Sequence, residues 1–452
     1  MRTPICDFVE GYCARHIIRA HMPGHKGVTL IGPEKRDITE IMGADSLYEA
    51  SGIIRQSERN AASLFGSAET FYSTEGSSLC IRAMLTMVLR YATERHASPT
   101  VLAARNVHKS FVSAAGLLDL PVEWLEPEVG SNLLSMKLST EKIEARIRSV
   151  RPIALYLTSP DYLGHTADIA SIAAICHRHH VLLLVDNAHG AYLKFLPTSL
   201  HPLDLGADLV CDSAHKTLPA LTGAAYLHVS KRAPKKLVYL AREAMALFGS
   251  TSPSYLILQS LDATNAYLDD GYAAGLADAV ERLGAAKETL TVHGYHFFGD
   301  ELLKWTIATK SYGYTGYEFA DLLAKYGIEC EFCDPDFVVL MLSAEFDEPI
   351  VRRLVMTMRM IPRRDPIEEE PPMPHLPQRA CSIREALFAK RIGYPAPDAC
   401  GRIFADLSCS CPPAVPILIC GETVDEHAIE LFDYYGITFC SVVDDRRHCP
   451  IP

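Results

Sequence analysis

Apolar and polar positions alternate in blocks between residues 62 and 230. In segment 77–92 the apolar residues recur at helical spacing, which predicts an amphipathic helix. Short apolar runs at 100–104, 153–159 and 181–188 predict buried strands, and helical patterns lie between them. Because these strands are apolar along nearly their whole length, we expect a mostly parallel sheet covered by helices on both faces.

The pattern changes after "GYT" at residues 313–315. Residues 316–360 read as a helix, two strands and a helix, which predicts a small α+β unit. The segment "RRDPIEEEPPMPHLPQRA" contains too many prolines for either element and is typical of a linker. We therefore expect an N-terminal segment over residues 1–60, a large domain over 61–300, a small α+β domain over 301–362, a linker over 363–380 and a C-terminal subdomain over 381–452.

Composition narrows the classes of function. The 452 residues are 48% hydrophobic and 22% charged, which is ordinary for a globular protein. A net charge of −12 argues against nucleic-acid binding. No apolar run reaches about 18 residues, so no membrane span is expected. The first residues lack the apolar region of a secretory signal, and the 14 cysteines are scattered through a long chain. We therefore expect a cytoplasmic protein with reduced thiols.

Polar residues gather where the predicted strands end. In an open α/β sheet, functional side chains lie just beyond the carboxyl ends of the strands. The turn "STEGSS" opens a helix at Ser77, and such a helix start binds phosphate well, although a plain glycine turn with a serine cap is the alternative. His108 follows the apolar run that ends at residue 104, Asp186 follows the run 181–185, and Lys216 follows the run "ADLVCD" (207–212). Asp186 alone could instead be the cap of the next helix.

Together these four features match the needs of pyridoxal 5′-phosphate (PLP). This cofactor requires a lysine for covalent attachment and a carboxylate that keeps its ring nitrogen protonated. It also requires a phosphate site and a flat group over the ring. Asp186 precedes Lys216 by 30 residues, which is enough for one crossover between neighbouring strand ends. The sequence therefore predicts a PLP enzyme.

Several motifs carry a resemblance to a known family. They include "HMPGHKG" (21–27), "RNVHKS" (105–110), "TSPDYLGHTADI" (158–169), "VDNAHGAY" (185–192) and "DSAHKTLPALTGAAYLH" (212–228). With them the chain resembles the PLP-dependent ornithine/lysine/arginine decarboxylases of the aspartate-aminotransferase fold, in their short bacterial form. The resemblance implies a three-layer α/β fold with a mostly parallel central sheet and a small C-terminal α+β domain. It also implies decarboxylation of a basic L-amino acid to its amine, as in polyamine metabolism.

The resemblance assigns roles to individual residues. It implies that Lys216 binds the cofactor covalently, that Asp186 pairs with the ring nitrogen and that His108 stacks on the ring. Ala188 would contact the other face of the ring, and His189 would lie near its phenolic oxygen. The phosphate would be held by Glu75, Gly76, Ser77, Ser78, Ser213 and His215. No metal is expected.

Assembly also follows from the resemblance. In this family the active site lies between two subunits, so Thr251 and Ser252 are expected to approach the site of the partner subunit. The "HMPGHKG" segment would lie near the same interface. Because the chain lacks a receiver-like N-terminal domain, we expect a homodimer or a dimer of dimers rather than a large ring.

Some residues depart from the family pattern. Glu75 stands where the family commonly has asparagine, and a carboxylate near a phosphate is unfavourable unless it is paired. Asp161 replaces a neutral residue, Ala414 replaces glycine and Cys420 replaces proline. These changes affect the substrate assignment more than the cofactor assignment. Asp45, Asp161 and Glu422 are candidate contacts for the cationic end of a substrate.

Other interpretations remain open at this point. The same scaffold supports aminotransferases and carbon–sulfur lyases, and a non-enzymatic paralogue is a third possibility that the intact lysine, aspartate and histidine set argues against. Cys330 and Cys333 form a CxxC pair, and "SCSCPP" adds Cys409 and Cys411. A tetrahedral metal site needs four converging ligands, and the CxxC pair falls in a predicted strand where side chains diverge.

Overall fold

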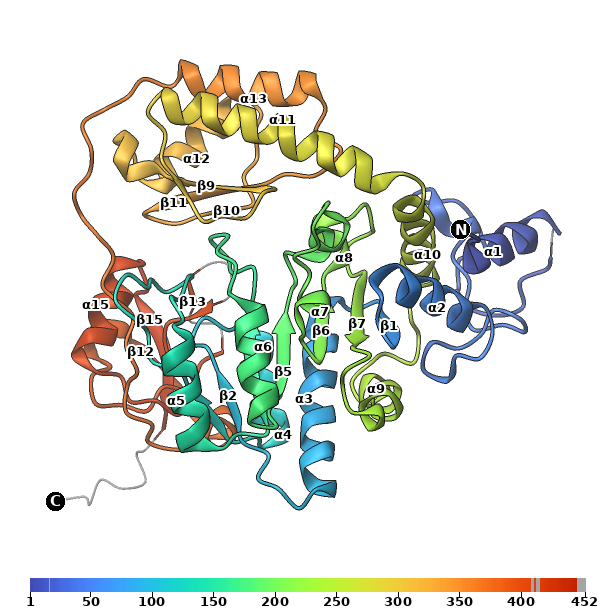
Figure 1. The fold of residues 1–452 in the computed structure, drawn as a ribbon, viewed down its shortest axis with the longest axis horizontal. Coiled ribbons are helices and arrows are strands. Elements are labelled where there is room, and N and C mark those ends of the chain that lie inside the picture. Colours follow the sequence, from blue (N-terminus) through green and yellow to red (C-terminus); the bar gives the residue numbers. More distant parts are fainter. Residues whose placement is uncertain (16, 408–409, 412–414, 445–452) are drawn as a thin grey trace. The chain divides into compact units, whose positions relative to one another are not determined.

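The computed structural model describes residues 1–15, 17–407, 410–411 and 415–444 (Figure 1). Cys409 and Ala414 lie outside these residues. The chain forms two compact units. The first comprises Met1–Ser98, Ile153–Ser159 and Asp168–Ala277, and the second comprises Pro99–Pro152, Pro160–Ala167 and Asp278–Pro452. The domain boundaries expected from the sequence stay predictions. Within the described part of the chain, no helix has the length and apolar character needed to cross a membrane.

Five strands form the sheet of the first unit, in the order β1-β7-β6-β5-β4. They are β1 (Glu69–Ser73), β4 (Ala154–Thr158), β5 (Leu182–Asp186), β6 (Leu209–Asp212) and β7 (Ala225–Val229). Strands β4, β5 and β6 run parallel, whereas β7 pairs antiparallel with both β6 and β1. The parallel centre agrees with the apolar runs in the sequence, since every residue of β5 is buried.

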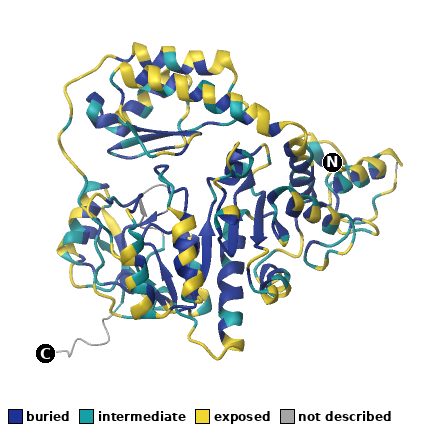
Figure 2. Cartoon of the chain, viewed as in Figure 1, coloured by how far each residue is buried: buried dark blue, intermediate teal, exposed yellow. Residues whose placement is uncertain are grey.

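The helices of the first unit lie before, between and after these strands in the sequence. They are α1 (Pro4–Ala14), α2 (Ile53–Phe65), α3 (Gly76–Glu94), α6 (Ile169–Arg178), α7 (Pro202–Leu205), α8 (Ala214–Thr217), α9 (Lys235–Ala246) and α10 (Tyr255–Asp269), with 3₁₀ turns at Pro33–Lys35, Leu47–Glu49 and Ala191–Phe195. The helix predicted at 77–92 is α3, and the apolar face expected there is buried at Leu79, Met84 and Val88. Figure 2 shows the strands buried and the outer helix faces exposed. The α/β fold class is thereby confirmed.

The second unit contains several small sheets. Strands β2 (Val101–Ala103) and β3 (Val122–Trp124) pair in parallel, and an antiparallel sheet has the order β10-β11-β9-β8. The strands of this antiparallel sheet are β8 (Phe297–Phe298), β9 (Lys304–Ala308), β10 (Phe332–Cys333) and β11 (Phe337–Met341). Two further antiparallel pairs join β12 (Arg391–Pro395) to β15 (Phe439–Val443) and β13 (Ser410–Cys411) to β14 (Val415–Pro416).

Helices complete this unit. They are α4 (Lys109–Leu118), α5 (Thr140–Val150), α12 (Gly316–Lys325), α13 (Glu348–Met360), α14 (Ile383–Phe388) and α15 (Glu426–Tyr434), with 3₁₀ turns at Thr309–Tyr312 and Ala396–Asp398, while α11 (Tyr272–Val292) continues from the first unit. The expected order of helix, two strands and helix is found in α12, β10, β11 and α13. The expectation that both CxxC cysteines lie in a strand is wrong, because β10 begins at Phe332 and leaves Cys330 outside it.

Candidate active site

Lys216 lies on the short helix α8, directly beyond strand β6. Its Nζ is 2.8 Å from Nε2 of His189, which follows strand β5. Because a lysine ammonium can only donate, Nε2 of His189 is the acceptor. The structure thus brings together two residues that the sequence assigned to one site, and it places a proton acceptor beside the lysine.

Asp186 ends strand β5 and is only 2% exposed. Its carboxylate accepts hydrogen bonds from the Tyr156 hydroxyl (3.2 Å), the Cys211 thiol (3.4 Å) and the Ala188 N–H (3.2 Å). Burial raises the pKa of Asp186, and the attraction of Lys216 opposes this effect. All three donors are uncharged, so this carboxylate suits the protonated ring nitrogen of PLP.

The turn before α3 carries residues that the sequence predicts to hold the phosphate. The Ser213 hydroxyl donates to the Ser77 hydroxyl at 2.9 Å, which joins the end of β6 to the start of α3. The Gly76 N–H donates to the Gly223 carbonyl at 2.8 Å and anchors the turn. Gly223 has a φ of +96°, and a Cβ there would lie 2.9 Å from the Thr74 carbonyl oxygen. Glycine is therefore required beside a helix start that attracts anions.

Two further residues predicted for the phosphate site, His215 and Glu75, have defined partners. Nδ1 of His215 donates to the Ala224 carbonyl at 2.9 Å, which fixes the tautomer of this ring. Glu75 is the N-cap residue of α3, and its carboxylate accepts the Ser250 N–H at 2.6 Å. The carboxylate that departs from the family pattern is thus paired with the segment that carries Thr251 and Ser252, which are both exposed. Their approach to a partner subunit stays a prediction.

His108 belongs to the second unit. It caps helix α4, where its Nδ1 accepts the Ser110 N–H at 3.1 Å. The proton of the neutral ring is therefore on Nε2. Its stacking on the cofactor stays a prediction.

The three candidate carboxylates for substrate binding all have structural partners. Asp45 accepts backbone N–H groups of Ser51 and Gly52 at the start of α2, and these bonds outweigh burial and lower its pKa. Asp161 accepts the N–H groups of Leu163 and His165 within its own turn. The structure therefore gives each of these two aspartates a role in holding a turn.

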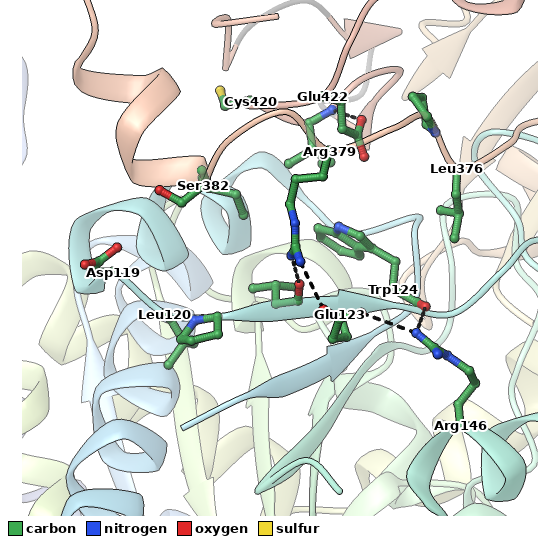
Figure 3. A pocket seen from close by; sticks show the side chains of 15 residues that line it. Asp119, Leu120, Glu123, Trp124, Arg146, Leu376, Arg379, Ser382, Cys420 and Glu422 are labelled. Atoms are coloured by element: carbon green, nitrogen blue, oxygen red, sulfur yellow. Dashed lines mark hydrogen bonds and ion pairs between the residues drawn. The ribbon is translucent and has the colours of Figure 1, made fainter. Parts of the chain in front are cut away.

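Glu422 lines a pocket of about 480 Å³ in the second unit (Figure 3). Its Oε2 accepts from Arg105 Nη2 at 2.8 Å, and both side chains are buried. In the same pocket, Arg146 and Arg379 both pair with Glu123 at 3.4 and 3.2 Å (Figure 3). The charges of this pocket are thus largely matched within the protein.

Sequence reasoning missed the donors around Asp186. Tyr156 and Cys211 lie in β4 and β6, the strands on either side of β5. The apolar strand patterns predict parallel neighbouring strands, and in such a sheet residues of the two neighbouring strands lie beside Asp186.

An α/β sheet whose strand ends carry a lysine and a buried aspartate agrees with the class of PLP-dependent enzymes that have the aspartate-aminotransferase fold. Within this class, the chain belongs to the ornithine/lysine/arginine decarboxylases, because residues 3–298 match the family model described as Orn/Lys/Arg decarboxylase, major domain. It is therefore a decarboxylase, as the motifs predicted, and the aminotransferase and lyase alternatives are not favoured.

Individual relatives agree with this assignment. The chain is 30% identical to an arginine decarboxylase of Halalkalibacterium halodurans, covering 94% of this chain and 91% of the relative. It is 29% identical to the uncharacterized protein YaaO of Bacillus subtilis, covering 95% and 93%. Among solved structures, the Francisella novicida lysine decarboxylase LdcF has a TM-score of 0.77 at 16% identity, covering 98% of this chain and 81% of that one, which shows a shared fold.

Proposed function

We propose that the chain is a PLP-dependent decarboxylase that converts L-arginine to agmatine and carbon dioxide, with L-lysine and L-ornithine as weaker substrates. The observation that carries the proposal is the pairing of two strand ends: Asp186 ends β5, and Lys216 follows the neighbouring β6. Arginine is placed first because two relatives that carry an activity in their names and match 94% of the chain are arginine decarboxylases. The Escherichia coli constitutive lysine decarboxylase matches only 54% of the chain, at 24% identity.

The residues of the first unit have complementary tasks in this proposal. Lys216 holds the cofactor covalently, and His189 takes up and returns the proton that the lysine exchanges. Asp186 keeps the ring nitrogen protonated, and the start of α3 with Ser77 and Ser213 holds the phosphate. When bound, PLP supplies an electron-withdrawing ring that stabilises the charge left on Cα as carbon dioxide departs.

A homodimer is part of the proposal. The N-terminal segment of the first unit exposes large apolar side chains, with Ile18 at 91%, Ile31 at 87% and Met42 at 100% exposure. Exposed apolar side chains grouped in one segment are typical of a protein interface. If Thr251 and Ser252 complete the site of a partner subunit, activity requires the dimer. Sedimentation at assay concentration should show no active monomer, and a fully active monomer would refute this part.

One assay tests the reaction. Purified protein with PLP is given L-arginine, L-lysine, L-ornithine or L-citrulline, and carbon dioxide and amine are measured. We expect agmatine from arginine and far slower turnover of citrulline, because a site that binds a cationic side-chain end discriminates against a neutral one. The proposal fails if no basic amino acid yields an amine while an added α-keto acid becomes an amino acid.

A further inference from the structure

We propose that Asp212 is a positioning residue, which fixes the strand end carrying Lys216 relative to the strand end carrying Asp186. It would do so through a buried network with Asn187, His201 and His228, a group we call the Asp212 network. The inference rests on the proposed function for the roles of Lys216 and Asp186.

The network lies at the ends of strands β5 and β6, next to the residues of the proposed site. Asp212 is the last residue of β6, and it precedes Lys216 by four positions. Its Oδ1 accepts from Asn187 Nδ2 at 2.7 Å, and Asn187 directly follows Asp186. The Asn187 N–H also donates to the Cys211 carbonyl at 2.9 Å. One side chain and one backbone bond therefore join the ends of the two neighbouring strands, β5 and β6 (Figure 1).

Two histidines hold the other oxygen of the carboxylate. Oδ2 of Asp212 lies 3.0 Å from His201 Nε2 and 3.1 Å from His228 Nε2. Asp212, both histidines and Asn187 are all 0% exposed. Burial alone would raise the pKa of Asp212, but the attraction and hydrogen bonds of the two histidines outweigh it and lower this pKa. Asp212 is therefore a buried carboxylate whose charge is held by three donors.

The network also reaches strand β1. Nδ1 of His228 lies 2.8 Å from the Thr70 hydroxyl, and Thr70 is paired with His228 across the β1–β7 ladder. Strand β1 leads directly into the turn that begins α3. The Asp212 network thus connects the strands that precede the phosphate turn, the lysine and the ring-nitrogen aspartate.

A metal ion is the competing interpretation, because the side-chain ligand atoms of Asp212, His201 and His228 all lie within 4.8 Å of one another. The hydrogen bonds argue against it. The Leu203 N–H donates to His201 Nδ1 at 3.3 Å, so the proton of the neutral ring is on Nε2. A nitrogen that binds a metal must be unprotonated, and here the nitrogen facing Asp212 carries the proton.

Strand β6 offers a matched control at its other end. Asp208 precedes β6, is 2% exposed, and accepts from His177 Nε2 at 3.1 Å and the Leu183 N–H at 2.8 Å. Asp208→Asn and Asp212→Asn are therefore the same change in two buried aspartates that bind a histidine, one just before β6 and one at its end, although His177 itself is exposed. Only Asp212 is bonded to a residue beside Asp186.

The experiment compares the two variants as holoenzymes. We measure the rate of PLP loss during dialysis, kcat and KM for L-arginine, and the melting temperature. For Asp212→Asn we expect PLP loss to be about tenfold faster and kcat to be about 10- to 100-fold lower, with KM changed less than about twofold, because small misplacement costs rate rather than binding. For Asp208→Asn we expect a lower melting temperature, with PLP loss and kcat within about twofold of wild type.

A second pair of variants covers a failure of Asp212→Asn to fold. His228→Gln keeps an N–H donor toward Asp212 and should restore most of the rate that His228→Leu loses. Equal effects of Asp212→Asn and Asp208→Asn, or equal effects of the two His228 variants, would overturn the proposal. So would one zinc ion per chain that is lost in His201→Gln. If wild type releases no carbon dioxide from any basic amino acid, the proposed function fails, while the PLP-loss rates still decide the role of Asp212.

Discussion

Two buried carboxylates, one in each unit, are held in different ways. Asp186 in the first unit receives hydrogen bonds from Tyr156, Cys211 and a backbone N–H, all of which are uncharged donors. Glu422 in the second unit forms an ion pair with Arg105 at 2.8 Å. Burial raises the pKa of both groups. The charge of Glu422 is matched by a cation inside the protein, so we expect Glu422 to act as a structural group. The donors to Asp186 are uncharged and leave it able to serve a cationic ring nitrogen, so we propose a functional role for Asp186.

The largest effect is expected at the lysine that completes the site of Asp186. Lys216→Ala should reduce turnover below detection and remove the visible absorbance of bound PLP, because no amine remains for covalent attachment. Spectra before and after borohydride reduction, together with the decarboxylation assay, measure both effects. The exposed Lys235→Ala in α9 is the control and should behave as wild type. A Lys216→Ala protein that still holds PLP covalently would mean that another lysine carries it.

The structural carboxylate should matter for stability. Glu422→Ala leaves Arg105 buried without its anion and should lower the free energy of unfolding by about 3–5 kcal/mol. Urea denaturation measures this change. The double variant Arg105→Met with Glu422→Leu should recover most of the loss, because replacing both partners removes the unpaired charge. A loss below about 1 kcal/mol in the single variant would contradict the comparison.

The functional carboxylate should instead matter for rate. Asp186→Ala should lower kcat by about 10²- to 10³-fold, as expected when one preorganised electrostatic partner is removed. Asp186→Asn, which keeps the size but not the charge, should lose a similar factor. Steady-state kinetics with L-arginine measures both variants, and urea denaturation checks that they remain folded. A near-normal rate would indicate a reaction with an unprotonated ring.

A third carboxyl sharpens the comparison through pH. Burial raises the pKa of Asp334 in the second unit to about 7, although its Oδ1 accepts the N–H groups of Asp336 and Phe337. Because the folded pKa exceeds the unfolded value of about 3.9, the folded state binds more protons, and stability falls as pH rises from about 4 to 7. Asp334→Asn should remove this dependence. Between pH 5 and pH 8 the free energy of unfolding of the wild type should therefore fall by about 2–3 kcal/mol more than that of the variant. Urea midpoints at the two pH values measure it, and parallel curves would contradict it.

The sequence predicted features that depend on local pattern. Asp186 and Lys216 could be found because each follows an apolar strand, and parallel strands place such residues at one edge. Tyr156 and Cys211 could not be assigned to Asp186, since their role depends on the register between strands.

Long-range pairing explains the other omissions. Arg105 and Glu422 are 317 positions apart, so their ion pair is not visible in the sequence. The Asp212 network combines residues of two strands, a helix start and the turn after β5, and no local motif marks it. A sequence pattern locates a site at a strand end, but it does not show which charges the fold has already matched.

The contact between Gly223 and the phosphate turn has a consequence for laboratory evolution. Since a Cβ at position 223 would press on the Thr74 carbonyl, random mutagenesis should return almost no substitutions there among active clones. Variants at this position should express as folded proteins that retain PLP poorly, because the disturbance falls on the anchored turn rather than on the core. A mutant library aimed at new substrates should therefore keep glycine at position 223 and vary other positions.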